Sequence, residues 1–397
     1  MFEKIRNYIY IGAVVYALVC FLDALFIPLK YSLDFDNYLF PFGFLHLIFV
    51  LFKVKRLRFF LLFFILIFLW GIFVELIYKG NMRIAYLYQL FYFIKWPVLM
   101  VVFIKPSFKL PSKDTIHRIV DSIFLISALL SVIMIINPFN LGYEIQNLYA
   151  PKEYINFIYY NKPGTYRLAG VFLNSNDNAL FLGAFILYYL FHRSKKYWYF
   201  ITLAILLFFI AQSRTVLLGL MLITIIYFVH RIIKNKIVLS KGFKKILAFS
   251  LFIGIIVMSI SKNLQSILTG KAFQSNSIMI RYNNFKNFVS DKEVNKLIGS
   301  GVINNPLKNI GVYIDSEIVS ILIQFGIFGL FFWLLLFIGA FSVFISTKSN
   351  KFLLMYFLLI FISSLTNYTF LGGQSGVVIS FFVSLHFYLN REKLESQ

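Results

Sequence analysis

The chain has 397 residues, of which 60% are hydrophobic, 20% are aromatic and only 14% are charged. Soluble domains carry about a quarter charged residues, so this composition, with a mean hydropathy of +0.81, excludes an ordinary soluble protein. The formal net charge is +22. A nucleic-acid-binding surface would need a soluble basic domain to carry such a charge, and the composition excludes one.

Apolar runs long enough to cross a hydrocarbon core of about 30 Å recur along the whole sequence. We expect about twelve membrane-spanning helices, at residues 8–27, 38–52, 59–78, 84–104, 116–136, 168–191, 198–212, 215–230, 246–261, 315–345, 352–371 and 375–389. The predicted fold class is therefore an all-α, polytopic integral membrane protein. Because no linker rich in serine, glycine or proline separates the spans, residues 1–397 are expected to form a single membrane domain.

Lysine and arginine alternate in abundance between successive connections. One side of the predicted membrane receives 23 of them and the other receives 14, while Lys95 lies within a span. Short loops rich in these residues stay in the cytoplasm, so both termini are expected to be cytoplasmic. The positive charge is thus explained mainly by topology, and no nucleic-acid partner is expected.

Two connections, residues 137–167 and 262–314, are longer than the others, and both are predicted to be extracytoplasmic loops. Long connections in compact proteins are uncommon and are usually functional. The second holds seven basic and two acidic residues, which suggests an anionic ligand. Long translocated segments also escape the charge bias, so a neutral explanation stays open.

Polar residues stand where the sixth span should begin. Arg167 is predicted to start a helix that continues through Asn174, Asn176, Asp177 and Asn178. The spacing of Asn174, Asp177 and Asn178 places these three side chains on one helix face. Since polar groups that face lipid are costly, this face is expected to line a cavity or to meet polar partners.

Two further arginines lie on the predicted outer side. Arg214 stands between two spans, and Arg281 opens an amphipathic helix, capped by Ser277, that we expect on the membrane surface. A guanidinium group makes bidentate, charge-assisted bonds to pyrophosphate and keeps its proton. Arg167, Arg214 and Arg281 are therefore candidate pyrophosphate ligands, although each one taken singly is also explained as an interfacial anchor.

Two carboxylates, Asp315 and Glu317, begin the span predicted at 315–345. Either one is a candidate general base for an attacking hydroxyl group. Asp315 is alternatively the N-cap of this helix, and it can serve as cap and base together. Gly326 and Gly329, further along the same span, are predicted to permit close helix packing.

Other polar residues receive structural predictions. Lys95 is expected to form an ion pair with Asp177 or Glu75, because a charge inside a span needs a partner. Residues 299–301, Gly-Ser-Gly, are predicted as a turn. None of the five histidines falls in a predicted outer loop, so neither an extracytoplasmic histidine base nor a metal site is expected.

Several of these features form a pattern over residues 165–345 that resembles the O-antigen ligase and polymerase superfamily of bacterial envelope polysaccharide biosynthesis. Ligases of this superfamily carry His-Asn or His-Ser where this chain has Asp-Ser, whereas aspartate is familiar at that position among polymerases. The resemblance therefore favours an O-antigen polymerase (Wzy-like). The residues that carry it are Arg167, Gly170, Asn174, Asn176, Ser213, Arg214, Ser277, Arg281, Gly299, Gly301, and Asp315-Ser316 followed after nine residues by Gly326 and Gly329.

The resemblance implies a metal-independent, inverting glycosyl transfer, without a cofactor, at the outer face of the bacterial plasma (inner) membrane. A hydroxyl group of one undecaprenyl-pyrophosphate-linked repeat unit would attack the anomeric carbon of another, and lipid pyrophosphate would leave. The three arginines would hold pyrophosphate, while Asn174, Asn176 and Asp177 would contribute to substrate binding. Asp315, with Glu317 as second candidate, would orient or deprotonate the acceptor. The expected partners are these lipid-linked oligosaccharides, the bilayer, a flippase and a chain-length regulator.

Other functions stay open at this point. An O-antigen ligase would transfer the glycan to a lipid A core, and a polysaccharide flippase or other secondary transporter would also have about twelve spans. A noncatalytic partner of the polysaccharide machinery is a further alternative. Transporters are expected to show internal repeats and charges in both halves, whereas the polar residues of this chain concentrate in its second half.

Overall fold

The fold of the chain is described by a computed structural model. The described residues are 2–26, 35–79, 90–104, 110–149, 168, 170–172, 175–193, 197–211, 213–233, 283, 286, 290, 295–301, 316–345, 351–365 and 373–390. Within these ranges the secondary structure is helical, and no strand occurs. The predicted all-α class is therefore confirmed for the part of the chain that the structure describes.

The described helices range from a three-residue 3-10 helix to long apolar α-helices. In chain order they are α1 (Phe2–Phe26), α2 (Phe35–Lys53), α3 (Lys55–Lys79), α5 (Tyr92–Val101), α6 (Lys113–Ile136), the short 3-10 helix η2 (Pro138–Asn140), α7 (Leu141–Tyr149), α9 (Ser175–His192), α10 (Trp198–Ala211), α11 (Arg214–Ile233), α15 (Glu317–Ile345), α16 (Lys351–Ser364) and α17 (Gly373–Leu389).

By length and composition alone, three segments are long and apolar enough to cross a membrane, namely Glu3–Phe26, Lys113–Ile136 and Glu317–Phe341, the last of which has a non-helical residue at Gly326. Shorter apolar helices accompany them. Many large apolar side chains on α1 and α6 point outward, as expected for surfaces that lipid covers. These properties support an α-helical membrane protein. The count of twelve spans stays a prediction.

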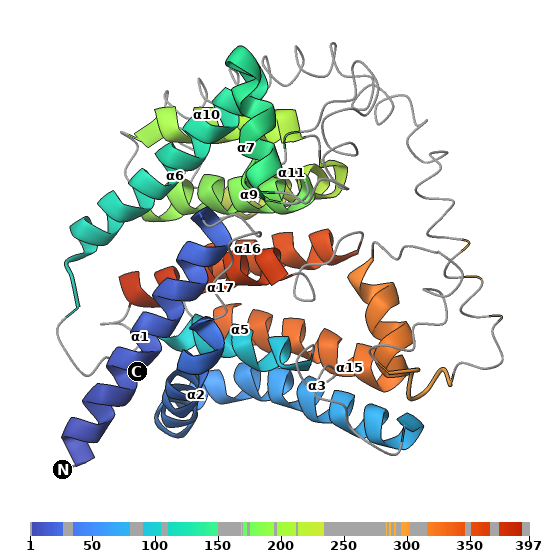
Figure 1. Cartoon of the computed structure of the whole chain (residues 1–397). Helices are drawn as coiled ribbons and strands as arrows, with labels where there is room; N and C mark the ends of the chain where they lie inside the picture. Colours follow the sequence, from blue (N-terminus) through green and yellow to red (C-terminus); the bar gives the residue numbers. More distant parts are fainter. Residues whose placement is uncertain are drawn as a thin grey trace.

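The two C-terminal helices form the centre of the structure. In Figure 1, α16 and α17 lie between one group formed by α6, α7, α9, α10 and α11 and another formed by α2, α3, α5 and α15. Small residues allow this close contact: a Cβ atom on Gly376 of α17 would lie 2.4 Å from the indole ring of Trp96 on α5. Helices from both ends of the sequence therefore share one core.

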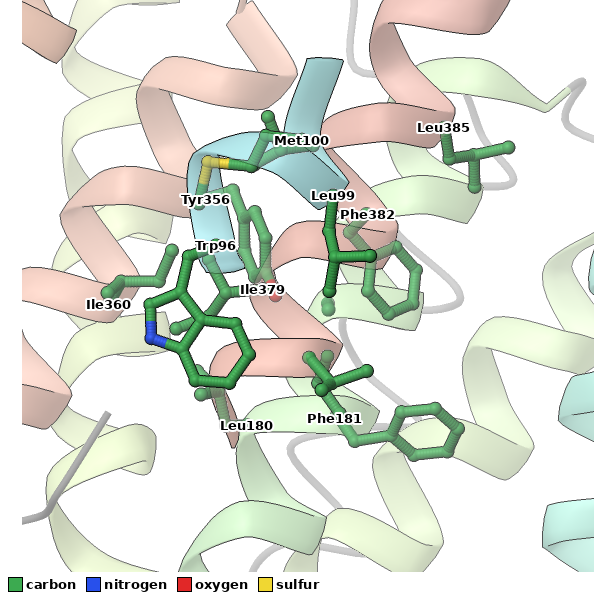
Figure 2. Packing of buried hydrophobic residues seen from close by; sticks show 14 of the residues in the cluster. Trp96, Leu99, Met100, Leu180, Phe181, Tyr356, Ile360, Ile379, Phe382 and Leu385 are labelled. Atoms are coloured by element: carbon green, nitrogen blue, oxygen red, sulfur yellow. The ribbon is translucent and has the colours of Figure 1, made fainter. Parts of the chain in front are cut away.

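This core is continuous across four helices. Figure 2 shows side chains from each of them in contact: Trp96, Leu99 and Met100 of α5, Leu180 and Phe181 of α9, Tyr356 and Ile360 of α16, and Ile379, Phe382 and Leu385 of α17. All of them are buried. Because these helices pack on both groups, the central pair fixes how the two groups are placed relative to each other.

Side-chain contacts show which helix ends lie together. Arg193 at the end of α9 forms an ion pair with Asp121 near the start of α6, and the ring nitrogens of His192 and His386 lie 3.1 Å apart. The start of α6 and the ends of α9 and α17 therefore meet at one end of the bundle. All three were predicted to lie on the cytoplasmic side. Which side of the membrane this end of the bundle faces stays a prediction.

The loop predicted at 137–167 begins with helical structure instead. Asn137 adopts a left-handed conformation that ends α6, and its side-chain oxygen accepts a hydrogen bond from the amide of Tyr143 at 3.1 Å. One residue thus ends α6 and caps α7. Because α7 has only nine residues, it contains no apolar run of spanning length, which is why the hydropathy pattern missed it.

Candidate functional site

Helix α15 is broken at Gly326. This glycine has φ 67° and ψ −167°, a backbone conformation that essentially only glycine adopts. The two halves of α15 run in different directions (Figure 1). The prediction of one continuous helix over 315–345 is therefore wrong. Apolar residues continue on both sides of the break, so the hydropathy pattern does not reveal it.

A short segment, residues 295–301, lies against the break, and we call it the strap. In an unbroken helix, the carbonyl groups of Ile323 and Gln324 would accept hydrogen bonds from the amides four residues later. At the break they accept from the strap. The amide and the hydroxyl of Ser300 donate to Ile323 O at 2.9 and 3.0 Å, and the amide of Gly301 donates to Gln324 O at 3.0 Å.

The strap also receives the amides that the break releases. The amide of Ile327 donates to Lys296 O at 3.0 Å, and the amide of Phe328 donates to Leu297 O at 3.3 Å. The strap is therefore inserted into the hydrogen-bond ladder of the helix, replacing bonds on both sides of the break. Buried backbone groups need such partners, above all in lipid, so the broken conformation is stabilised rather than frayed.

Trp70 of α3 completes this arrangement. Its indole N–H donates to the carbonyl oxygen of Phe325 at 2.8 Å, which the break would otherwise leave without its helical partner. Its ring also packs against Phe328 and Phe332 of the second half of α15, with centroids 5.4 and 6.0 Å away. Trp70 is thus a structural support that ties α3 to both sides of the break.

Two glycines are required by the close approach of strap and helix. A Cβ atom on Gly326 would lie 2.3 Å from Leu297 O, and one on Gly299 would lie 2.4 Å from Gln324 O. Both contacts are with backbone atoms, which cannot move aside. Gly326 was predicted to permit helix–helix packing, but it permits an interruption of helix α15 and a close backbone contact with the strap instead. The Gly-Ser-Gly sequence, predicted as a turn, forms the hydrogen-bonding end of the strap.

The first half of α15 begins with Ser316 and a buried carboxylate. Ser316 is the N-cap residue, because its hydroxyl oxygen accepts from the amide of Val319 at 3.5 Å. Asp315, the alternative cap predicted from the sequence, lies outside the described residues. Glu317 follows the cap and is fully buried, at 0% exposure. A carboxylate in the first turn of a helix interacts favourably with the helix dipole.

The second half of α15 folds back onto this carboxylate. The indole N–H of Trp333 donates to Glu317 Oε1 at 2.8 Å. Sixteen residues of straight helix would place these two positions about 24 Å apart. The hydrogen bond therefore requires the break at Gly326, and the two halves of α15 form a helical hairpin that buries Glu317 inside it.

A second buried carboxylate, Glu75 of α3, lies beside the strap. Its side chain is fully buried, and its Oε1 atom lies 2.5 Å from the place where a Cβ atom of Gly301 would be. The first half of α15 therefore has one buried carboxylate at its start and another near the strap that closes its end. The predicted ion pair of Lys95 with Glu75 or Asp177 stays a prediction.

The polar start of α9 differs from the prediction. Helix α9 begins at Ser175 and not at Arg167. Gly170 has a left-handed φ of 60°, which does not fit a right-handed helix that starts at Arg167. Asn178 is buried and donates to Leu168 O at 3.1 Å. Its role is therefore to hold the preceding turn. Asn176 and Asp177 lie half-buried in the first turn of α9.

The structure describes only part of the predicted site. Glu317, Asn176 and Asp177 are described with their side chains, and Arg214 is described as the first residue of α11 without its side chain. The remaining predicted residues, which lie outside the described ranges, are Arg167, Asn174, Arg281 and Asp315. Glu75 and Trp333 were not predicted as site residues, although an ionisable residue such as Glu75 inside an apolar span is a usable signal.

Comparison with models of known protein families gave no match, and comparison with curated proteins gave none either. The resemblance to the superfamily therefore rests on the sequence motifs alone. Among the residues that the structure describes, no three histidine, cysteine, aspartate or glutamate side chains form a cluster that could hold a metal ion.

Proposed function

We propose that this protein is a membrane-embedded glycosyltransferase that polymerises undecaprenyl-pyrophosphate-linked repeat units into a surface polysaccharide. One observation supports this most. The part of the motif that runs from Ser316 to Gly326 coincides with one structural unit, the first half of α15. Ser316 caps the first half of α15 and Gly326 ends it, so the spacing of the motif equals the length of that half-helix, about 13 Å.

The burial of Glu317 supports an enzymatic role for this unit. Removing a carboxylate from water costs several kcal/mol even when it is hydrogen-bonded, and ionisable residues inside membrane proteins are usually functional. An apolar side chain would fill the same space at a lower cost. The carboxylate is therefore better explained by chemistry at the start of α15 than by the stability of the hairpin.

The proposed reaction is a displacement at an anomeric carbon. Asp315 or Glu317 accepts the proton of an acceptor hydroxyl group while the hydroxyl oxygen forms a bond to that carbon. The bond between the anomeric carbon and the pyrophosphate oxygen breaks, and lipid pyrophosphate leaves with the electron pair. Arg167, Arg214 and Arg281 are the proposed ligands of this leaving group. The anomeric configuration is inverted, and the reaction takes place at the outer face of the bacterial plasma membrane.

The broken helix also favours a second candidate, a secondary transporter. Transporters of several folds bind substrate or coupling ions where membrane helices are interrupted. A transporter would move a solute across liposomes without any lipid-linked donor, whereas a polymerase would consume lipid-linked repeat units and release lipid pyrophosphate. These two activities can be measured on the same reconstituted protein.

The carboxylate variants test the proposed reaction. Purified protein in proteoliposomes would receive lipid-linked repeat units, and chain elongation would be followed by gel electrophoresis. A general base contributes about 10²- to 10⁴-fold in rate, so either Glu317→Gln or Asp315→Asn should lower the rate by that factor while the protein stays folded. Full activity in both variants would show that neither carboxylate is the base.

A further inference from the structure

Trp333 is held in a single position by its surroundings. The side chain is 1% exposed. Its ring packs against Phe337 of the same helix, with centroids 4.6 Å apart, and stacks with Phe361 of α16 at 5.9 Å and an interplanar angle of 29°. These contacts fix the direction of the indole N–H, which donates to Glu317 Oε1.

We infer that Trp333 is a positioning residue that orients the Glu317 carboxylate for reaction, and that the break at Gly326 serves to bring the two together. This inference rests on the proposed function. It assigns a role to the glycine half of the motif: without the break, Trp333 would lie about 24 Å from Glu317 along a straight helix. The glycine of the motif then places Trp333 where it can orient the carboxylate of the same motif.

A purely structural hydrogen bond would not need this pair of residues. Trp70 shows the structural solution at the same hairpin, where an indole N–H donates to the backbone carbonyl of Phe325. A buried carboxylate is a more costly hydrogen-bond acceptor for an indole N–H than a backbone carbonyl, because its charge must also be removed from water. Retaining a carboxylate opposite Trp333 is therefore better explained by a demand on the carboxylate itself.

The expected consequence concerns the turnover step. A hydrogen bond to a charged group fixes the orientation of the side chain, and the free energy of such a bond corresponds to a rate factor of about 10- to 100-fold. In the proposed reaction Trp333 does not contact the substrate. Removing its indole donor should therefore lower kcat and leave KM for the lipid-linked repeat unit nearly unchanged.

The test compares Trp333→Phe with Trp70→Phe as a matched control. Each substitution removes one indole donor at the same hairpin and keeps an aromatic ring in place. Elongation kinetics and thermal unfolding would be measured for both purified proteins. We expect Trp333→Phe to lower kcat by about 10- to 100-fold with KM nearly unchanged, while Trp70→Phe keeps kcat at a similar loss of thermal stability.

A double substitution completes the test. If Trp333 acts through Glu317, adding Trp333→Phe to Glu317→Gln should cause no further loss of kcat. Equal losses of kcat in the two tryptophan variants, or additive losses in the double variant, would overturn the positioning role while leaving the polymerase activity of the wild type intact. A wild-type protein that does not elongate lipid-linked units would instead overturn the proposed function, and the positioning role with it.

Discussion

Replacing Gly326 by alanine should unfold the hairpin at the centre of the candidate site. The backbone conformation of Gly326 costs a residue with a Cβ atom about 1–3 kcal/mol. The new Cβ would also lie 2.3 Å from Leu297 O, so the strap must move and its hydrogen bonds to Ile327 and Phe328 would be strained or lost. At about 0.5–1.5 kcal/mol for each bond, the total loss of stability is about 2–6 kcal/mol.

A matched control is Gly183→Ala in the interior of α9. A Cβ there would lie 3.0 Å from the end of the flexible Leu359 side chain and at ordinary contact distances of 3.6 and 3.8 Å from Val216 and Leu220. Alanine also favours a helix by about 1 kcal/mol over glycine. The two variants would be compared by thermal and denaturant-induced unfolding of the purified proteins in detergent. We expect a large loss of stability for Gly326→Ala and a change within about 1 kcal/mol for Gly183→Ala.

The geometry itself can be measured by electron paramagnetic resonance. Spin labels would be placed at Ile318 and Leu334 after the buried Cys20 is replaced by alanine. The hairpin predicts a distance well below the roughly 24 Å that sixteen residues of straight helix would give. A distance near 24 Å in the otherwise wild-type chain, together with wild-type stability of Gly326→Ala, would refute the broken helix.

Two further variants test the packing away from the hairpin. Asp121→Asn should destabilise the protein by about 3–5 kcal/mol in denaturant unfolding, because it leaves the largely buried Arg193 without its carboxylate partner. Adding Arg193→Met to this variant should recover much of the lost stability. Unchanged stability of Asp121→Asn would mean that the ion pair does not form. Tyr356→Phe should be neutral or raise the stability of the protein by about 1 kcal/mol, since the buried Tyr356 hydroxyl has no hydrogen-bond partner among the described residues. A marked drop in the thermal midpoint of the variant would show that this hydroxyl is paired.

The sequence predicted the helical class and many helix positions, because apolar runs of spanning length are a local property. It could not predict the break in α15. Ile327 and Phe328 are as apolar as their neighbours, and their amides are bonded by residues of the strap about thirty positions earlier in the chain. Such a contact depends on tertiary structure, and the only local signals were the glycines at the two meeting points.

The start of α9 was predicted incorrectly for a related reason. The polar residues from Arg167 onward were treated as one helix, but Gly170 takes a left-handed conformation and Asn178 binds the turn that precedes the helix. Asn178 thus has a structural partner in the chain itself. For the candidate site, the sequence identified Glu317 and the glycines of α15, whereas the partner Trp333 became apparent only through the fold-back of the helix.

The most direct test of the proposed function is to count the products of the purified wild-type protein. Proteoliposomes would receive lipid-pyrophosphate-linked repeat units extracted from cells that lack this chain, and both polymer length and released undecaprenyl pyrophosphate would be measured. We expect a ladder of products with one pyrophosphate lipid released for each new glycosidic bond, and we expect Glu317→Gln or Asp315→Asn to lower the rates of both by about 10²- to 10⁴-fold. Repeat units that stay unjoined in the presence of folded wild-type protein would contradict it.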